Sequence, residues 1–156
     1  MILYLVRHAK ARKGGKDRLR PLTGRGLKEI NAVAAFLKPL RLRVGAIWHS
    51  DRVRAVQSAR ILSGAIGFSE KMIQLSYLGP DDSIAPAVRS IRKARGDVMI
   101  VGHLPFLGKL ASKFLTRKPS DEILKLSTSS IVALRSDDGR KWAVEWLLAP
   151  SLIQSL

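Results

Sequence analysis

The chain has 156 residues, of which 46% are hydrophobic, and it contains no cysteine. This length suffices for one well-buried core and is short for two ordinary domains, so we expect residues 1–156 to form one domain. The lack of cysteine excludes disulfides, thiolate metal sites and every mechanism that uses a cysteine nucleophile. No stretch approaches the roughly 20 apolar residues of a membrane span, so we expect a cytoplasmic protein without a membrane partner.

The formal net charge is +16, from 28 Lys and Arg against 12 Asp and Glu. Such a charge attracts phosphorylated ligands, acidic proteins or nucleic acids. The densest basic run, which either is a solvated loop or steers an anionic substrate, consists of Lys10, Arg12, Lys13, Lys16, Arg18, Arg20 and Arg25. Because no aromatic residue is interleaved with these charges to stack on bases, nucleic acid is a disfavoured partner.

Apolar runs alternate with amphipathic segments along most of the chain, a pattern that predicts strands alternating with helices. In chain order the predicted elements are a strand at residues 2–6, a helix from the N-cap Thr23 to Pro39, a strand at 44–48, a helix from the cap Ser50 and the first-turn acid Asp51 to about Gly64, a strand at 72–78, a turn at 80–83, a helix at 84–95, a strand at 97–101 and, after residues 102–105, a helix through Leu115.

The C-terminal part of the chain predicts a β-hairpin. Residues 130–135 and 141–148 are rich in β-branched and aromatic residues, and a turn cluster at 136–139 separates them. The alternating strands and helices before it imply a largely parallel sheet covered on both faces. We therefore predict the α/β class, as a three-layer α/β/α sandwich whose mostly parallel central sheet gains antiparallel character at one side.

Three predicted strands end on residues that suit the binding of anions. These residues are Arg7 and His8 after the first strand, Arg54 shortly after the second, and His103 with Leu104 after the strand at 97–101. The carboxyl ends of strands share one edge of an open α/β sheet, so side chains that are distant in sequence can converge there. Free backbone amides at the start of the following helices also favour an anion.

The pairing of Arg7 with His8 favours attack on phosphorus. Protonating a histidine beside a guanidinium costs electrostatic energy, so we expect the His8 imidazole to stay neutral and nucleophilic while Arg7 holds an oxyanion. Taken singly, His8 could close a strand, Arg54 could be one of many surface arginines, and His103 could cap a helix. Their coincidence at one sheet edge favours a phosphate-binding site.

These residues fall in blocks that resemble the histidine phosphatases of the phosphoglycerate mutase-like superfamily, and most closely the small SixA-type phosphohistidine phosphatases. The blocks run nearly end to end and comprise residues 5–8, 20–23 with Gly26, 50–55 with Gln57, 102–105 with Gly108, 128–131, and Trp146. The resemblance implies a phosphoglycerate mutase-like fold, in a minimal form without a large inserted subdomain. It also implies that His8 becomes transiently phosphorylated, that Arg7, Arg54 and His103 bind the phosphoryl oxygens, and that Arg20 is a further candidate for this pocket.

The sequence departs from the family in two places. Ala9 stands where the family usually has glycine, and the chain has no room for the insert that brings a glutamate general acid to larger relatives. In the corresponding region Tyr77 occupies a place where a carboxylate is often found, and Asp81 or Asp82 could substitute for it. An alkoxide leaves poorly without a proton donor, whereas a phosphoramidate nitrogen leaves readily once it is protonated, so a phosphohistidine substrate is favoured over an ester.

The leading hypothesis is therefore a metal-independent phosphohistidine phosphatase that acts on a phosphorylated protein. We expect His103 to be a cationic donor when phosphate is bound, and His8 to present an unprotonated nitrogen while its other nitrogen donates to a backbone carbonyl. No spacing of acidic residues and histidines gathers a metal site, and no cofactor is implied. Two alternatives stay open: a phosphatase of a small phosphate ester with the same nucleophile, and a basic polyanion-binding module with a decayed site.

Overall fold

The computed structural model describes residues 1–120 and 123–153. Its elements, in chain order, are β1 (Ile2–Arg7), the 3₁₀ helix η1 (Asp17–Leu19), α1 (Gly24–Leu37), the 3₁₀ helix η2 (Lys38–Leu40), β2 (Ala46–His49), α2 (Val53–Ala65), β3 (Ile73–Gln74), α3 (Ala85–Lys93), β4 (Val98–Gly102), α4 (Phe106–Thr116), β5 (Ile131–Arg135), β6 (Ala143–Leu148) and α5 (Pro150–Ile153). The order confirms the predicted alternation of strands and helices and the predicted hairpin.

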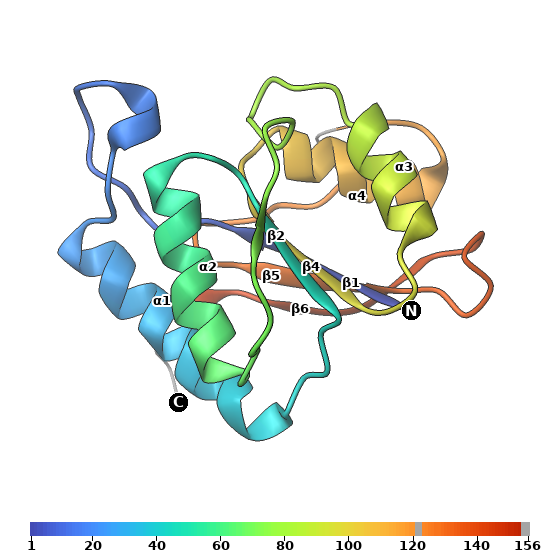
Figure 1. Cartoon of the computed structure of the whole chain (residues 1–156), viewed down its shortest axis with the longest axis horizontal. Coiled ribbons are helices and arrows are strands. Elements are labelled where there is room, and N and C mark those ends of the chain that lie inside the picture. Colours follow the sequence, from blue (N-terminus) through green and yellow to red (C-terminus); the bar gives the residue numbers. More distant parts are fainter. Residues whose placement is uncertain (121–122, 154–156) are drawn as a thin grey trace.

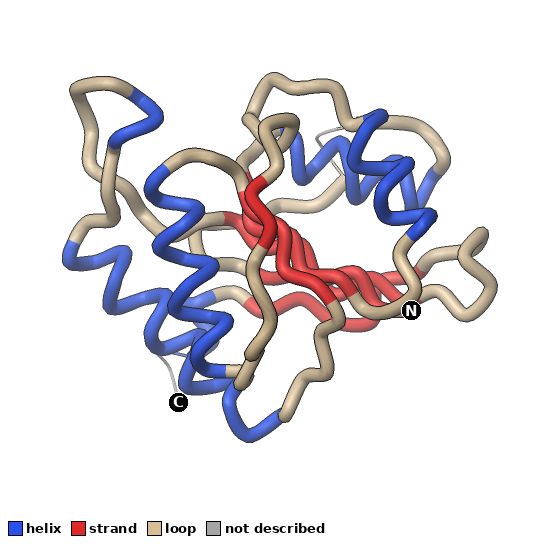
Figure 2. Tube along the Cα trace, in the orientation of Figure 1, coloured by secondary structure: helices blue, strands red, loops and turns tan. Residues whose placement is uncertain are grey.

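The strands form one sheet in the order β3-β2-β4-β1-β5-β6. Strands β3, β2, β4 and β1 are parallel, whereas β5 pairs antiparallel with both β1 and β6. Helices α1 and α2 cover one face of the sheet and α3 and α4 cover the other (Figures 1 and 2). This confirms the three-layer α/β/α sandwich with a mostly parallel central sheet and an antiparallel hairpin at one side.

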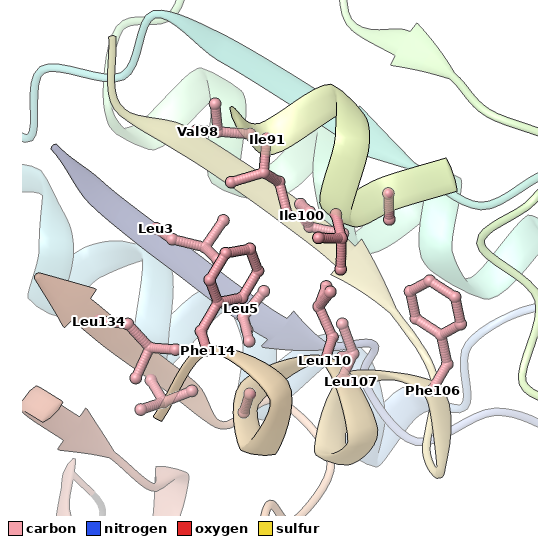
Figure 3. Close-up of a cluster of buried hydrophobic side chains, with 14 of the residues drawn as sticks. Leu3, Leu5, Ile91, Val98, Ile100, Phe106, Leu107, Leu110, Phe114 and Leu134 are labelled. Atoms are coloured by element: carbon pink, nitrogen blue, oxygen red, sulfur yellow. The ribbon is translucent and has the colours of Figure 1, made fainter. Parts of the chain in front are cut away.

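Strand β1 is continuously apolar because both of its faces are buried. Leu3 and Leu5 pack into the cluster under α3 and α4, whereas Tyr4 and Val6 pack into the cluster under α1 and α2. Figure 3 shows Leu3 and Leu5 facing the apolar side chains of α3 and α4. Burial of each such leucine stabilises the fold by roughly 1.5–3 kcal/mol, so the strand that ends at Arg7 is firmly anchored.

The prediction of a strand at residues 72–78 is wrong except for its second and third residues. Only Ile73–Gln74 pairs with the sheet, and both residues are exposed at its edge. The chain then leaves the sheet, and the Tyr77 hydroxyl lies 3.0 Å from Ser90 Oγ of α3. Residues 66–84 contain no helix or strand other than β3, which agrees with a minimal fold without an inserted subdomain at this point.

One helix cap is confirmed and another is wrong. Thr23 caps α1, since its Oγ1 accepts a hydrogen bond from the Gly26 N–H over 3.0 Å. The N-cap of α2 is Arg52, whereas Ser50 and Asp51 lie outside the helix. Ser50 Oγ instead accepts from the Arg52 N–H over 3.3 Å, a local turn that competes with capping.

The ends of three adjacent strands meet at one edge of the sheet. His49 pairs with Val101 and Arg7 pairs with Gly102, so β2, β4 and β1 end in nearly the same plane. The segment that follows β1, the blue loop with the short helix η1 in Figure 1, projects beyond this edge. In residues 1–120 and 123–153, every helix is too short or too polar to cross a membrane.

Candidate active site

His8, Arg54 and His103 meet at this edge from three elements. His8 directly follows β1, Arg54 lies in the first turn of α2, and His103 directly follows β4. Arg54 Nε donates a hydrogen bond to His8 Nε2 over 3.2 Å, and the ring centroids of His8 and His103 are 4.8 Å apart. His8 remains partly exposed, whereas Arg54 and His103 are buried. The structure therefore brings the three predicted side chains together, with His8 on the accessible side.

The His8 ring is held by its own backbone. His8 Nδ1 lies 2.7 Å from the Ala9 carbonyl oxygen, to which a neutral ring donates its proton. The lone pair is thereby placed on Nε2, the atom that faces Arg54. The Ala9 N–H donates to Ser58 Oγ over 3.0 Å and Ala9 is fully buried, so an alanine at this position fits the packing.

His103 is held by Ser50. Its Nε2 lies 2.8 Å from Ser50 Oγ, and Asp51 Oδ1, the other acceptor near that hydroxyl, is 3.5 Å away. The direction of this contact depends on which His103 nitrogen carries the proton, because the Ser50 hydroxyl can donate to His103 or to Asp51. His103 Nδ1 is buried and has no hydrogen-bond partner among the described residues. In the tautomer that accepts from Ser50, the proton is on Nδ1, and this nitrogen is then a donor directed to the site.

Burial and positive neighbours keep both histidines neutral. Burial lowers the pKa of His8 to about 4, with smaller lowering by Arg54, Arg7 and Arg20, against the Ala9 hydrogen bond, which raises it. Burial lowers the pKa of His103 to about 2, with further lowering by His8 and Arg54. The neutral His8 ring agrees with the sequence prediction, although burial outweighs the guanidiniums as the cause. Near neutral pH both rings are therefore neutral in the protein alone, and a cationic His103 with phosphate bound stays a prediction.

Several buried nitrogen atoms around the two histidines have no hydrogen-bond partner. In the part of the chain that the structure describes, these are Arg7 Nε, Arg20 Nε, Arg52 Nε and His103 Nδ1. Arg7 is otherwise held by a 2.8 Å hydrogen bond from its Nη1 to the Leu126 carbonyl oxygen. Buried donors are almost always satisfied in proteins, so a cluster of free donors calls for an acceptor. The arrangement suits an oxyanion such as a phosphoryl group.

The sequence did not predict two residues that lie among these arginines. Arg52 and Asp17 form an ion pair of 3.0 Å, and the Asp17 carboxylate also contacts Arg54 and Arg20. The signal for Asp17 was present, because it is the one acid within the basic run of residues 10–25. Arg52 carried no signal, since its contacts depend on how that run folds over α2.

The remaining candidates are engaged in other contacts or are exposed. The Leu104 side chain packs against the core, and α4 begins at Phe106, so His103 and Leu104 lie in a turn before the helix and not within its first turn. Asp82 Oδ2 accepts the Gly79 N–H over 2.6 Å, and Asp81 is exposed.

We expect the protein to lose stability as the pH falls from 6.5 toward 4. Above pH 6.5 His8 is neutral in both the folded and the unfolded state, so its contribution to the free energy of unfolding is fully present. This contribution is lost as the pH falls through the folded pKa of about 4, because the unfolded state binds a proton that the folded state does not. The loss amounts to about 3 kcal/mol for His8. Urea unfolding at pH 7.0, 5.5 and 4.5 measures it, with His8→Asn as the control that lacks this titration. Equal pH dependence in the two proteins would contradict the prediction.

Comparison with known proteins agrees with this geometry. The profile of the histidine phosphatase superfamily (branch 1) matches residues 3–78. An uncharacterized protein of Picosynechococcus sp. (strain ATCC 27264 / PCC 7002 / PR-6) is 32% identical over 148 residues, covering 90% of this chain and 88% of its own. The chain belongs to the histidine phosphatase superfamily. The phosphohistidine phosphatase SixA of Escherichia coli (strain K12) is 22% identical over 96% of this chain and 94% of its own.

The fold of this histidine phosphatase is shared with a solved relative. A structure of the protein histidine phosphatase SixA complexed with tungstate superposes with a TM-score of 0.88 at 21% identity, covering 98% of this chain and 99% of that one. At this identity the likeness shows the fold. Together with membership of the superfamily, it makes the protein a phosphatase with the phosphoglycerate mutase-like architecture that the sequence predicted.

Proposed function

We propose that this histidine phosphatase removes a phosphoryl group from a histidine of another protein, with His8 as the nucleophile and residues 1–156 acting as one catalytic domain. The observation that carries the proposal is the environment of His8: a neutral ring whose Nε2 carries the lone pair, faces Arg54 and lies among the charges of Arg7 and Arg20. The relative that bears the name phosphohistidine phosphatase SixA supports the same assignment.

In the first step, the His8 Nε2 lone pair attacks phosphorus and the bond from phosphorus to the substrate nitrogen breaks. One P–N bond forms as another is lost, so the step exchanges bonds of the same kind. The electron pair of the broken bond stays on the departing nitrogen, and the substrate imidazole leaves as a neutral ring because its other nitrogen carries a proton, as Nδ1 does in His8. Phosphoryl transfer demands little covalent help from the protein beyond position and charge.

The surrounding donors stabilise the charge on the transferring group. Arg7 Nε, Arg20 Nε and His103 Nδ1 are buried and have no hydrogen-bond partner in residues 1–120 and 123–153, and Arg54 Nε faces the nucleophile. Fixed donors of this kind act without reorganisation when negative charge spreads over the three phosphoryl oxygens. We assign to Leu104 a lesser role, through its backbone in the turn that carries His103.

The second step regenerates the enzyme. Water attacks phosphorus, the bond from phosphorus to His8 Nε2 breaks, and inorganic phosphate leaves with the oxygen of that water. The His8 ring returns to its neutral form with the proton on Nδ1 because the Ala9 carbonyl oxygen stays 2.7 Å away. Splitting the hydrolysis in this way replaces one difficult displacement by two easier ones.

The acids near the site are already engaged, which favours a phosphoramidate over an alkyl ester. Among the described residues, Asp17 is paired with arginines, Asp51 is paired with Arg18 over 3.1 Å, and Asp82 holds the Gly79 amide. These contacts occupy the three carboxylates, and Asp81 is exposed. A leaving imidazole has less need of a proton donor than an alkoxide, so the site favours phosphohistidine over an alkyl ester.

The substrate preference is tested with three leaving groups. We expect turnover of a phosphohistidine-bearing protein and of p-nitrophenyl phosphate, whose phenolate leaves without an acid, and turnover of phosphoserine that is lower on the order of 10²- to 10⁴-fold, the usual contribution of general acid catalysis. Release of inorganic phosphate measures all three. Comparable turnover of phosphoserine would favour the small-ester alternative, and Tyr77→Phe, Asp81→Asn and Asp82→Asn would then show which group serves as its acid.

A further inference from the structure

Asp17 joins the basic run to the catalytic edge. It opens η1, and its carboxylate receives three guanidiniums from two parts of the chain. These ion pairs are made by Arg20, by Arg52 Nη1 at 3.0 Å and by Arg54 Nη2 at 3.3 Å. The Asp17 backbone carbonyl oxygen also accepts a hydrogen bond from Arg54 Nη1 over 2.7 Å. One residue thus binds Arg54 through both its side chain and its main chain.

The contacts of Arg54 divide its guanidinium into two sides. Both Nη atoms donate to Asp17, and Nε donates to His8 Nε2. A guanidinium has five N–H donors in a rigid plane, so fixing the Nη1 and Nη2 contacts also fixes the direction of Nε–H. Because Asp17 holds the far side, the side that faces His8 presents the Nε–H and one Nη2 hydrogen. The Nε–H is donated to the His8 Nε2 lone pair, and a phosphoryl group on Nε2 would use that lone pair and leave both hydrogens to its oxygens.

Without an anion among them, these arginines would repel one another. The pKa of Arg54 is lowered to about 10, first by burial and then by the charges of Arg20 and Arg52. Asp17 supplies the negative charge that all three guanidiniums share. Since Arg54 is buried on α2 whereas Asp17 lies on a partly exposed turn, the ion pairs also hold the basic run against the catalytic edge.

We propose that Asp17 is a positioning residue of the phosphatase reaction, which aims the Arg54 guanidinium at the phosphoryl group on His8. The proposal rests on the proposed roles of His8 and Arg54. The opposite role for Asp17 is that of a resident anion that competes with phosphate for the arginines. The hydrogen bonds favour positioning, because Asp17 occupies the Nη side of Arg54 and leaves Nε toward His8.

The test compares Asp17→Asn with Asp17→Glu and with a matched control, Glu145→Gln. The Asp17 side chain is 44% exposed and the Glu145 side chain 40%, and Glu145 pairs with Arg135 on the hairpin, so the control removes the same charge at similar exposure. We expect Asp17→Asn to lower kcat for the phosphohistidine protein on the order of 10- to 100-fold, the scale of a misplaced catalytic group. Asp17→Glu should recover part of the loss, and Glu145→Gln should retain wild-type kcat.

A second readout is independent of turnover. The Arg54 Nε–H resonance, identified by its absence in Arg54→Lys, should move and exchange faster with water in Asp17→Asn but not in Glu145→Gln. An unchanged resonance, or a kcat/KM that is unchanged or raised in Asp17→Asn, would overturn the proposal. If the wild-type protein cleaved no phosphoryl substrate, the proposed function would fail while the Arg54 resonance still decided whether Asp17 positions the guanidinium.

Discussion

Replacement of His8 by alanine is expected to abolish phosphatase activity, with a fall in kcat/KM on the order of 10⁴-fold or more. The reason is geometric as well as chemical. Among the described residues, His8 is the partly exposed histidine, and its Nε2 lone pair faces the Arg54 guanidinium, whereas His49 and His103 are buried. Removal of the ring leaves the cations to bind phosphate with no atom to accept the phosphoryl group.

The measurement that isolates this step is rapid-quench labelling with a radioactively phosphorylated substrate. Wild-type protein should carry a transient label on a histidine, and His8→Ala should carry none. His103→Gln is the informative comparison, because it removes a buried donor and keeps the nucleophile. We expect it to slow labelling on the order of 10²- to 10³-fold while leaving the label on His8. A labelled or active His8→Ala protein would refute the assignment of the nucleophile.

The sequence predicted the part of the site that depends on local pattern. A continuous apolar run predicts β1 as a strand that is buried on both faces, and the residues that follow a parallel strand lie at the carboxyl edge of the sheet. This rule alone places Arg7 and His8. Arg54 and His103 follow from the same rule applied to β2 and β4. Strand order could not be predicted from local pattern, yet the three strands are neighbours in the sheet, and this adjacency brings the side chains into contact.

The parts that could not be predicted depend on contacts between distant segments. The local sequence predicts Ser50 as a helix cap, because it does not show that the Ser50 hydroxyl will form a hydrogen bond with His103. In the sequence, Asp17 is a single acid within a basic run. Its role becomes visible in the structure, where it forms ion pairs with Arg52 and Arg54. The strand expected at 72–78 shrinks to two residues because an exposed edge offers a strand one partner, and apolar side chains there gain more by packing toward α3.

The tight approach of α1 to the segment after β1 leads to a large expected effect on stability. A Cβ added at Gly26 would lie 2.2 Å from the Lys10 carbonyl oxygen and 2.9 Å from the Lys10 nitrogen, both backbone atoms two residues beyond His8. The same carbonyl oxygen accepts the Thr23 N–H over 2.9 Å, so the helix start and this segment cannot separate without losing the cap.

Gly26→Ala is therefore expected to lower the free energy of unfolding by about 3 kcal/mol, the upper range for an overpacked site, or to shift Lys10 and with it the His8 ring. Gly24→Ala is the matched control: it lies in the same helical turn, a Cβ there meets nothing within 4 Å, and alanine is favoured over glycine in a helix by roughly 0.5–1 kcal/mol. Urea unfolding of the two variants measures the difference, with the slope m compared to verify that the unfolded states are alike. Equal midpoints would show that α1 and the segment after β1 are not packed as closely as the clash at Lys10 requires.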